Sequence, residues 1–301
     1  MVLPLGEIHS IEAAIRAAAT EFERYGLFYG HGTSTAIDEA SWLVLFAVGL
    51  SPAVEPDYSQ TLSDSEVLAC NQLLDRRIKE RLPAAYLTGQ AWFAGYQFLS
   101  DERALVPRSP LAEFINDDFF GVLGDVQAPR ILDLCTGGGC IAIACAHACS
   151  ESLVDASDLS SAALSLAQEN VDLHGLQQRV TLYEGSLFEP LNNVYSLIIS
   201  NPPYVDNADI AAMPIEFSHE PLMGLEAGFD GLDLVRVMLR EAANYLEPQG
   251  CLVVEVGNSM TALEAAYPQL EFSWLQFSQG GHGVFLITRE ELLAAASSAL
   301  L

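Results

Sequence analysis

ILDLCTGGGCIAIA, residues 131–144, is the stretch that decides the fold of this chain. Its pattern indicates a buried strand, then a glycine-rich turn, then a helix of small residues, which together begin an α/β unit. Gly137, Gly138 and Gly139 let the backbone take positive φ and pass close to a ligand. A ligand at this turn would lie beyond the carboxyl ends of the strands, where open α/β sheets usually bind.

Two features of the turn narrow the class of ligand. The spacing is not Gly-x-Gly-x-x-Gly and no Gly-Lys-Ser/Thr follows, which disfavours a dinucleotide or a P-loop nucleotide. Asp133 lies at the end of the strand, where it would oppose a pyrophosphate but suits the cationic amino group of S-adenosylmethionine. The alternative is a plain strand-to-helix turn that binds nothing.

A second carboxylate follows the next expected strand. Asp158 ends that strand, about twenty residues beyond the glycines, where an acid can accept hydrogen bonds from both ribose hydroxyls. Ser160 is the expected N-cap of the following helix. Asp155 is the alternative ligand, but Asp158 lies nearer the loop edge. Leu187, after a third strand, is placed to flank the adenine ring or to be an ordinary core residue.

Strands and helices alternate from about residue 110, which predicts an α/β fold with a mostly parallel sheet covered on both faces. The last two strands are separated too briefly for a crossover helix, so they should pair antiparallel. Seven strands are expected, at 130–134, 153–157, 180–183, 195–200, 250–256, 273–277 and 283–288.

The first eighty residues have helical periodicity. A first helix contains Ile11 to Phe22, a second begins after Thr35, and a third begins at a capping box of Ser63 and Glu66. We therefore expect a small helical domain at 1–85, a β-hairpin linker at 86–108 and a catalytic domain at 109–301.

A rigid turn, Asn201-Pro202-Pro203-Tyr204, follows the strand at 195–200. Its two prolines fix φ and remove two backbone donors, so the turn is rich in hydrogen-bond acceptors. The Asn201 side-chain oxygen and the Pro202 carbonyl suit a substrate –NH₂ held by its two hydrogens, and the Tyr204 ring can cover a planar amide or a base. A plain polar turn is the alternative, which the shared sheet edge with the glycine turn disfavours.

Charge and composition restrict the partners of this 301-residue chain. It has 40 acidic and 13 basic residues, a formal net charge of -27. Such a field repels nucleic acid and attracts a basic partner, although solubility alone also explains it. The longest apolar run, 42–50, is far shorter than the ~20 residues of a membrane span, and no signal-peptide pattern opens the chain. We expect a cytoplasmic protein that binds neither membrane nor nucleic acid.

Cysteine spacing gives no support for a metal site. Zinc sites usually pair cysteines two to four residues apart with a second pair elsewhere, and this pattern is lacking. Buried reduced thiols are expected, with no metal. The six cysteines are Cys70, Cys135, Cys140, Cys145, Cys149 and Cys251.

Further segments carry a resemblance to one family. They are YLTGQAWFAGYQF at 86–98, ERALVPRSP at 102–110, EFSHEPLMGLEAGFDGLD at 216–233, EVGNS at 255–259 and WLQFSQGGHGVFLIT at 274–288. With the glycine turn and NPPY, they make nearly the whole chain similar to the HemK/PrmC-like glutamine methyltransferases. It resembles most closely the PrmB type, which methylates a glutamine of large-subunit ribosomal protein L three. NPPY alone is shared with amino-methylating DNA enzymes, whereas the VPRSP and HEP segments are more specific.

The resemblance implies a Rossmann-like class I methyltransferase fold with S-adenosylmethionine as cofactor. The residues that would contact the cofactor are Asp133, Cys135, Thr136, Gly137, Gly138, Gly139, Asp158, Leu187 and Asn201. Those that would hold the glutamine are Asn201, Pro202, Pro203, Tyr204 and Arg108. Of these, Asn201, Pro202 and Tyr204 would serve the catalytic step, and Glu216, His219 and Glu220 would belong to a substrate-side loop rather than act as bases.

Three departures from the release-factor enzymes favour the ribosomal-protein subtype. Those enzymes usually have Gly in place of Cys135, an aromatic residue in place of Leu187, and Pro with an acid after VPR, where this chain has Ser109 and Pro110. The implied reaction puts a methyl group on a glutamine amide nitrogen of a basic ribosomal protein, which the helical domain would help to recognise. The alternatives are a release-factor glutamine methyltransferase, a DNA or RNA adenine methyltransferase, and a ribosome-assembly factor without activity.

Overall fold

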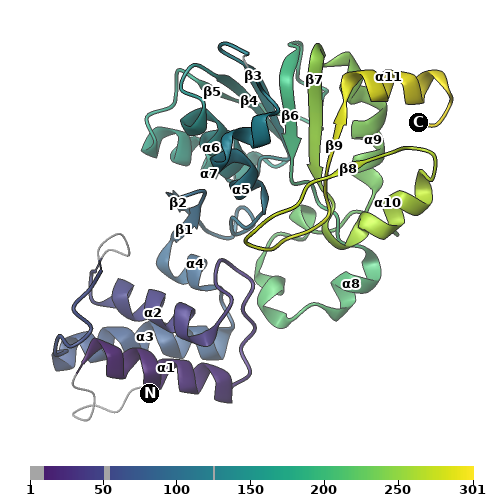
Figure 1. Cartoon of the computed structure of the whole chain (residues 1–301). Helices are drawn as coiled ribbons and strands as arrows, with labels where there is room; N and C mark the ends of the chain where they lie inside the picture. The colour runs from purple at the N-terminus through teal and green to yellow at the C-terminus, as the bar shows by residue number, and fades with distance from the viewer. Residues whose placement is uncertain (1–9, 51–54, 125) are drawn as a thin grey trace. The chain divides into compact units, whose positions relative to one another are not determined.

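The computed structural model describes residues 10–50, 55–124 and 126–301 and divides the chain into two units (Figure 1). The helical unit holds the chain up to Ala91, together with the short segments Ser100–Glu102 and Pro214–His219. The sheet unit holds Trp92–Leu99, Arg103–Met213 and Glu220–Leu301.

The described part of the helical unit contains four α-helices, three of which begin at a serine or threonine N-cap. Thr35 accepts a hydrogen bond from the Asp38 amide, and Ser63 and Glu66 form the expected capping box, so both predicted helix starts are confirmed. Apolar residues at helical spacing make the core, with Phe22, Leu43 and Leu74 fully buried. The helices are α1 Ile11–Arg24, α2 Ala36–Ala47, α3 Asp64–Glu80 and α4 Ala84–Thr88.

A short 3-10 helix from late in the chain, η2 Ile215–His219, belongs to the helical unit. Its Glu216 carboxylate is 1% exposed and accepts hydrogen bonds from the Phe28 amide at 3.0 Å and from Arg81 at 3.2 Å. Arg77, fully buried, lies between this carboxylate and Glu39. Burial raises the pKa of Glu216, but the Phe28 amide and the two arginines outweigh it and hold the pKa below its usual value. The Glu216 charge therefore serves an internal network.

The sheet unit contains one seven-stranded sheet in the order β5-β4-β3-β6-β7-β9-β8. The first five strands are parallel, and β9 pairs antiparallel with both β7 and β8. The predicted seven-stranded, mostly parallel α/β sheet and its antiparallel final pair are confirmed. The strands are β3 Arg130–Leu134, β4 Leu153–Asp158, β5 Val180–Glu184, β6 Tyr195–Ser200, β7 Leu246–Glu255, β8 Ser273–Trp274 and β9 Val284–Thr288.

Helices cover both faces of this sheet (Figure 1). Side chains of the central strands alternate between two cores, so Ile131 packs on the α5, α6 and α7 side and Leu132 on the α9, α10 and α11 side. The helices and 3-10 turns of this unit are α5 Leu111–Asn116, η1 Asp118–Gly121, α6 Cys140–Ala148, α7 Ser161–Leu173, α8 Asn207–Ala212, η3 Leu222–Gly224, α9 Asp233–Glu241, η4 Ala242–Asn244, η5 Gly257–Ser259, α10 Met260–Ala266 and α11 Arg289–Ser297.

A separate two-stranded sheet, β1 Gln90–Phe93 with β2 Tyr96–Leu99, lies within the range 86–108. Strand β7 begins four residues earlier than expected and β8 ends three residues earlier. Among the described residues, no helix has the length and apolar character needed to cross a membrane.

Candidate active site

The strand register places three predicted site residues at one edge of the sheet. Leu134, the last residue of β3, is paired with Ser157 of β4 on one side and with Ser200 of β6 on the other. The next residues along the chain, Cys135, Asp158 and Asn201, therefore leave the sheet side by side. This is the carboxyl edge, and it is a point where strand order reverses, since β4 and β6 flank β3.

The glycine turn takes the expected positive φ at two of its three glycines, and Gly138 does not have it. Gly137 has φ +56° and Gly139 has φ +82°, both in the left-handed region. A Cβ on Gly139 would lie 3.2 Å from the Ala167 Cβ, so glycine also permits the packing of α6 against α7. Asn170, on α7, donates a hydrogen bond to the Gly138 carbonyl at 2.9 Å and fixes the turn from behind.

Asp158 is bonded directly to the glycine turn. Its Oδ2 accepts a hydrogen bond from the Gly137 amide at 2.8 Å, and its Oδ1 accepts one from the Ser160 amide at 2.8 Å. Burial raises its pKa, and these amides oppose the shift. Each carboxylate oxygen has two lone-pair sites, so both oxygens keep acceptor capacity for the hydroxyls of a ribose.

Asp155, the alternative to Asp158, has a structural role instead. It is 1% exposed, and its Oδ2 accepts hydrogen bonds from Tyr195 and Asn193 at 2.9 Å and from Arg130 at 3.2 Å. Three side chains already donate to its Oδ2 and the carboxylate is almost inaccessible, which favours Asp158 as the ribose ligand.

Asp133 lies fully buried beneath the glycine turn. Its Oδ2 accepts hydrogen bonds from the Thr136 hydroxyl at 2.6 Å and the Ala142 amide at 3.1 Å. Its Oδ1 has no hydrogen-bond partner within the described residues. Burial raises its pKa to about 7 against the effect of those two bonds. A cation brought near this carboxylate would favour its charged form, as the prediction for the cofactor amino group requires.

Leu187 and Cys135, two other residues predicted to contact the cofactor, are partly or fully buried at this edge. The Leu187 side chain is buried in the same core as Phe188, which is the ordinary core role left open by the sequence. Its backbone carbonyl accepts a hydrogen bond from Ser157, so the segment after β5 is held near the site edge. Cys135 has φ +58° and is half-buried, and burial raises the pKa of its thiol. All six cysteines are free.

The turn Asn201–Tyr204 is bonded to its neighbours on both sides. The Ser200 hydroxyl donates to the Leu134 carbonyl at 2.7 Å, which ties the start of this turn to the start of the glycine turn. The Ser259 hydroxyl donates to the Tyr204 carbonyl at 2.8 Å. The Asn201 side chain makes no hydrogen bond to the rest of the described chain, so its carboxamide is available to a ligand.

Two glycines make room for Tyr204. A Cβ on Gly257 would lie 2.7 Å from the Tyr204 ring, and one on Gly231 would lie 2.2 Å from the Tyr204 carbonyl oxygen. Both glycines have positive φ. Any larger residue at either position would displace the ring or the turn.

A buried carboxylate, Glu255, holds the far end of the Tyr204 ring. The Tyr204 hydroxyl donates to Glu255 Oε1 at 2.8 Å, and the Ser109 hydroxyl donates to Oε2 at 2.5 Å. Glu255 is 5% exposed, and burial raises its pKa to about 7. Glu255 is not among the site residues expected from the sequence. Its only local signal is an acid at the end of an apolar strand, in the EVGNS segment.

Arg108, predicted to contact the glutamine, is paired within the chain. Its two terminal nitrogens each lie 2.6 Å from a carboxylate oxygen of Glu220, whose Oε1 also accepts from the Val106 amide. The Glu220 side chain is fully buried. The segment 216–220, expected to form one substrate-side loop, is divided between the units, with Glu216 in the helical unit and Glu220 in the sheet unit. Neither carboxylate is placed as a base.

The edge as a whole fits S-adenosylmethionine. The glycine turn allows close backbone approach and Asp158 keeps acceptor capacity for a ribose. Asp133 has a buried oxygen to which no described residue donates a hydrogen bond. The acceptor-rich turn that would hold the methyl-accepting group is the next loop along the edge. Fold and site together define a class I methyltransferase that uses S-adenosylmethionine.

Comparison with known proteins gives a narrower assignment. Residues 119–219 match the family model described as the methyltransferase small domain. The chain is 44% identical over 289 residues to the ribosomal protein uL3 glutamine methyltransferase of Neisseria gonorrhoeae, covering 95% of this chain and 97% of that protein. It is 43% identical to the enzyme of the same name from Neisseria meningitidis, with 95% of each chain covered. The chain therefore belongs to the family of ribosomal protein uL3 glutamine methyltransferases.

Among solved structures, the chain is similar to a methyltransferase from Pyrococcus furiosus. The TM-score is 0.47 and the identity 15%, with 64% of this chain and 88% of that chain covered.

Proposed function

We propose that this chain transfers a methyl group from S-adenosylmethionine to the side-chain amide nitrogen of a glutamine in ribosomal protein uL3. The observation that carries the proposal is the register of β3 and β6, which sets the Asn201–Tyr204 turn beside the glycine turn. The names of the relatives, at 43–44% identity over nearly their whole length, supply the protein substrate.

The cofactor supplies an activated methyl carbon, and the chain supplies its position. In this proposal Asp158 accepts hydrogen bonds from the ribose hydroxyls of the cofactor, and Asp133 faces its amino group. Residues Cys135 to Gly139 line its methionine portion. Leu187 lies on the adenine side. These residues fix the direction of the methyl group toward the neighbouring turn.

The Asn201–Tyr204 turn would hold the glutamine amide. The Asn201 side-chain oxygen and the Pro202 carbonyl accept its two N–H hydrogens, which draws electron density toward a nitrogen whose lone pair is otherwise delocalised. Pro203 keeps the turn rigid, and Tyr204 covers the flat carboxamide. Positioning of this kind can lower the barrier by roughly 7–11 kcal/mol at best.

No strong base is needed before the nitrogen attacks. The amide proton would become acidic only as the new N–C bond forms and the S–C bond breaks to give S-adenosylhomocysteine, and that proton would then be released to water. Asp206, two residues after Tyr204, caps α8 by accepting hydrogen bonds from the Ala208 and Asp209 amides. Glu216 and Glu220, further along the chain, are buried in ion pairs with arginines, which suits a mechanism without a carboxylate base. Arg108, through Glu220, would shape the substrate side of the turn.

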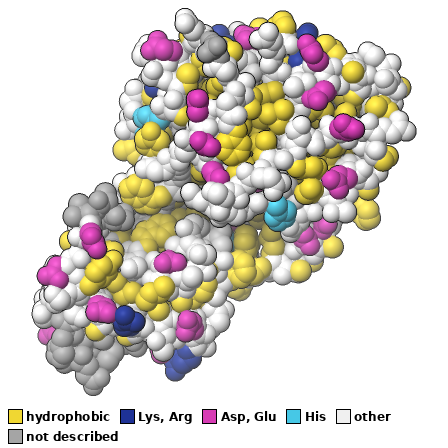
Figure 2. Space-filling view, in the orientation of Figure 1, with side chains coloured by type: hydrophobic (Ala, Val, Ile, Leu, Met, Phe, Trp, Pro, Cys, Tyr) yellow, Lys and Arg dark blue, Asp and Glu magenta, His cyan; other side chains and the backbone are white. Residues whose placement is uncertain are grey.

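We also infer that the helical unit at 1–85 recognises the protein substrate, that the segment 86–108 links it to the catalytic unit at 109–301, and that the enzyme acts in the cytoplasm without binding nucleic acid. The net charge of -27 supports a basic protein substrate. On the face drawn in Figure 2, acidic side chains are spread widely and lysine and arginine side chains are few.

The experiment is a methylation assay with labelled S-adenosylmethionine and, in separate reactions, purified ribosomal protein uL3, a release factor and DNA. We expect label on uL3 alone, and mass spectrometry should place the methyl group on a glutamine side chain. Label on the release factor or on adenine, with none on uL3, would refute the proposal.

A further inference from the structure

Phe229 is the most exposed large apolar side chain that the structure describes. It is 90% exposed, whereas the next most exposed large apolar residue among those described is 61% exposed. Leu222 and Met223, on the same segment, are 52% and 58% exposed. Several exposed apolar side chains on one short segment are a better candidate for an interaction surface than a single exposed residue.

The segment that carries these residues, Leu222–Asp233, is fixed to the catalytic turn. The Val205 amide donates to the Leu225 carbonyl at 2.9 Å, and the Ala227 amide donates to the Val205 carbonyl at 3.0 Å. Val205 directly follows Tyr204. We call Leu222–Asp233 the Phe229 loop.

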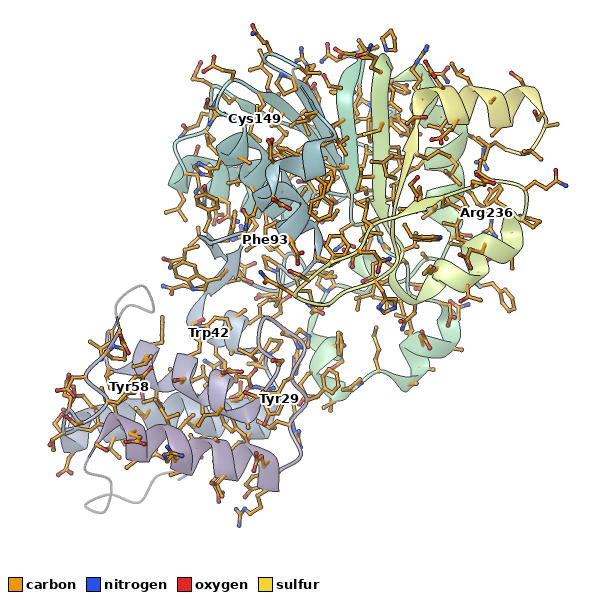
Figure 3. All side chains as sticks on the ribbon, in the orientation of Figure 1. Tyr29, Trp42, Tyr58, Phe93, Cys149 and Arg236 are labelled. Carbon is orange, nitrogen blue, oxygen red and sulfur yellow. The ribbon has the colours of Figure 1, made fainter. Side chains whose placement is uncertain are left out.

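The tip of the Phe229 loop is attached to α9 by an ion pair. Asp230 is paired with Arg236 of α9 (labelled in Figure 3), with Oδ1 2.9 Å from Nη1. Hydrogen bonding to Arg236 lowers the pKa of Asp230 below its usual value. Ala227 and Leu232, on either side of the tip, are 4% and 0% exposed. Because the loop is anchored on both sides and its phenylalanine is exposed to solvent, the loop is preorganised to bind a partner through that side chain.

The charge of this region selects the kind of partner. From Asn201 to Val235 the chain has seven acidic residues and no lysine or arginine. Two of the seven, Glu216 and Glu220, are buried in ion pairs, whereas Asp209, Glu226 and Asp233 are exposed. The surface beside the catalytic turn is therefore both apolar and acidic, which suits a basic protein segment that also carries an apolar side chain.

We propose that the Phe229 loop is the docking surface for the segment of the protein substrate that flanks the target glutamine, with Phe229 packed against an apolar side chain and the acids facing basic ones. This inference rests on the proposed function for the identity of the substrate. Because Phe229 lies outside the reacting centre, the contact it makes contributes to the affinity for the protein substrate.

The test measures binding and turnover separately, with the full chain. Titration calorimetry with purified ribosomal protein uL3 should show Phe229→Ser binding about 10- to 30-fold more weakly than the wild type, and Phe229→Leu much closer to it. Val194→Ser is the matched control, because Val194 is 50% exposed and precedes β6 at the opposite edge of the sheet. Melting temperature and S-adenosylhomocysteine affinity should be the same in all three variants, and higher salt should weaken binding of uL3 to the wild type.

Two outcomes would overturn the inference, and a third would overturn only the proposed function. Unchanged affinity in Phe229→Ser would remove the loop from substrate binding. A wild type that is dimeric in sedimentation, together with a monomeric Phe229→Ser, would show that a second copy of the chain covers the loop. A wild type that binds uL3 through Phe229 but does not methylate it would refute the proposed function and leave the docking surface standing.

Discussion

The two halves of the catalytic edge are built by different means. On the cofactor half, after β3 and β4, three glycines shape the backbone and an amide of the turn holds Asp158, which keeps acceptor capacity. On the substrate half, after β6 and β7, two prolines stiffen the turn, and Glu255, Ser259 and two glycines fix Tyr204. In the proposed function, the cofactor would meet a turn that keeps free hydrogen-bond acceptors, whereas the glutamine amide would meet a rigid turn.

The comparison predicts that the substrate half controls turnover. Asn201→Ala removes the side-chain acceptor that holds the amide, so kcat should fall by roughly 10²–10³-fold, as for other single groups that stabilise a transition state. Cofactor affinity should stay within about threefold, because the glycine turn and Asp158 are untouched. Single-turnover kinetics and calorimetry measure the two quantities.

Asn244→Ala is the control for this variant, because Asn244 is exposed in η4. It should leave both quantities unchanged. Normal turnover by Asn201→Ala would contradict the role given to the turn.

The cofactor half should show the reverse pattern. Asp158→Ala removes the ribose acceptor and the partner of the Gly137 amide, so cofactor affinity should fall about 10- to 100-fold, in line with hydrogen bonds to a charged group. Asp155→Ala should instead lower the melting temperature, because Arg130, Asn193 and Tyr195 lose a buried partner. If Asp155→Ala weakened cofactor binding more than Asp158→Ala did, the two assignments would have to be exchanged.

Local patterns in the sequence predict most of the fold and the cofactor half. The bounds of β3 and β6 are those expected. In each case an apolar run marks the strand, and the glycine or proline turn that follows marks its end. The glycine turn and Asp158 are likewise within a short distance of each other in the sequence. Their roles follow from one βαβ unit, which short-range spacing describes well.

The substrate half depends on contacts that no short stretch contains. Glu255 reaches Tyr204 across 51 positions and Ser109 across 146, because the register pairs Ser200 with Val254. Arg108 finds Glu220 across 112 positions. A sequence identifies such residues as candidates, but only the register of the sheet shows which of them meet.

Glu255 gives the third prediction, a coupling between two side chains. Glu255→Ala frees the Tyr204 ring, and kcat should fall about 5- to 30-fold, the effect of losing roughly 1–2 kcal/mol of positioning. Tyr204→Phe should have a similar effect, and the double variant should add little to either, because both remove one interaction. Glu255→Gln should recover part of the rate, since its amide oxygen can still accept from Tyr204.

A purely structural role for Glu255 would give a different result. The melting temperature would then fall in step with activity, and the double variant would be additive. Glu247→Gln is the control, because Glu247 also accepts a serine hydroxyl but does so at the start of β7.

The smallest expected effect is a pH dependence of S-adenosylhomocysteine affinity, which should depend on Asp133 and not on Glu255. Burial raises both pKa values to about 7, but only Asp133 is expected to face the cofactor amino group. That cation favours the ionised carboxylate, so S-adenosylhomocysteine affinity should rise about 3- to 10-fold as the pH increases from about 6 to 8. Below the pKa of Asp133, binding of the cationic amino group requires the carboxyl group to lose its proton. Above that pKa, the carboxylate is already charged. Asp133→Asn should abolish this rise in calorimetry, whereas Glu255→Gln should keep it. A rise that vanished in Glu255→Gln instead would place the cationic group on the substrate half of the edge.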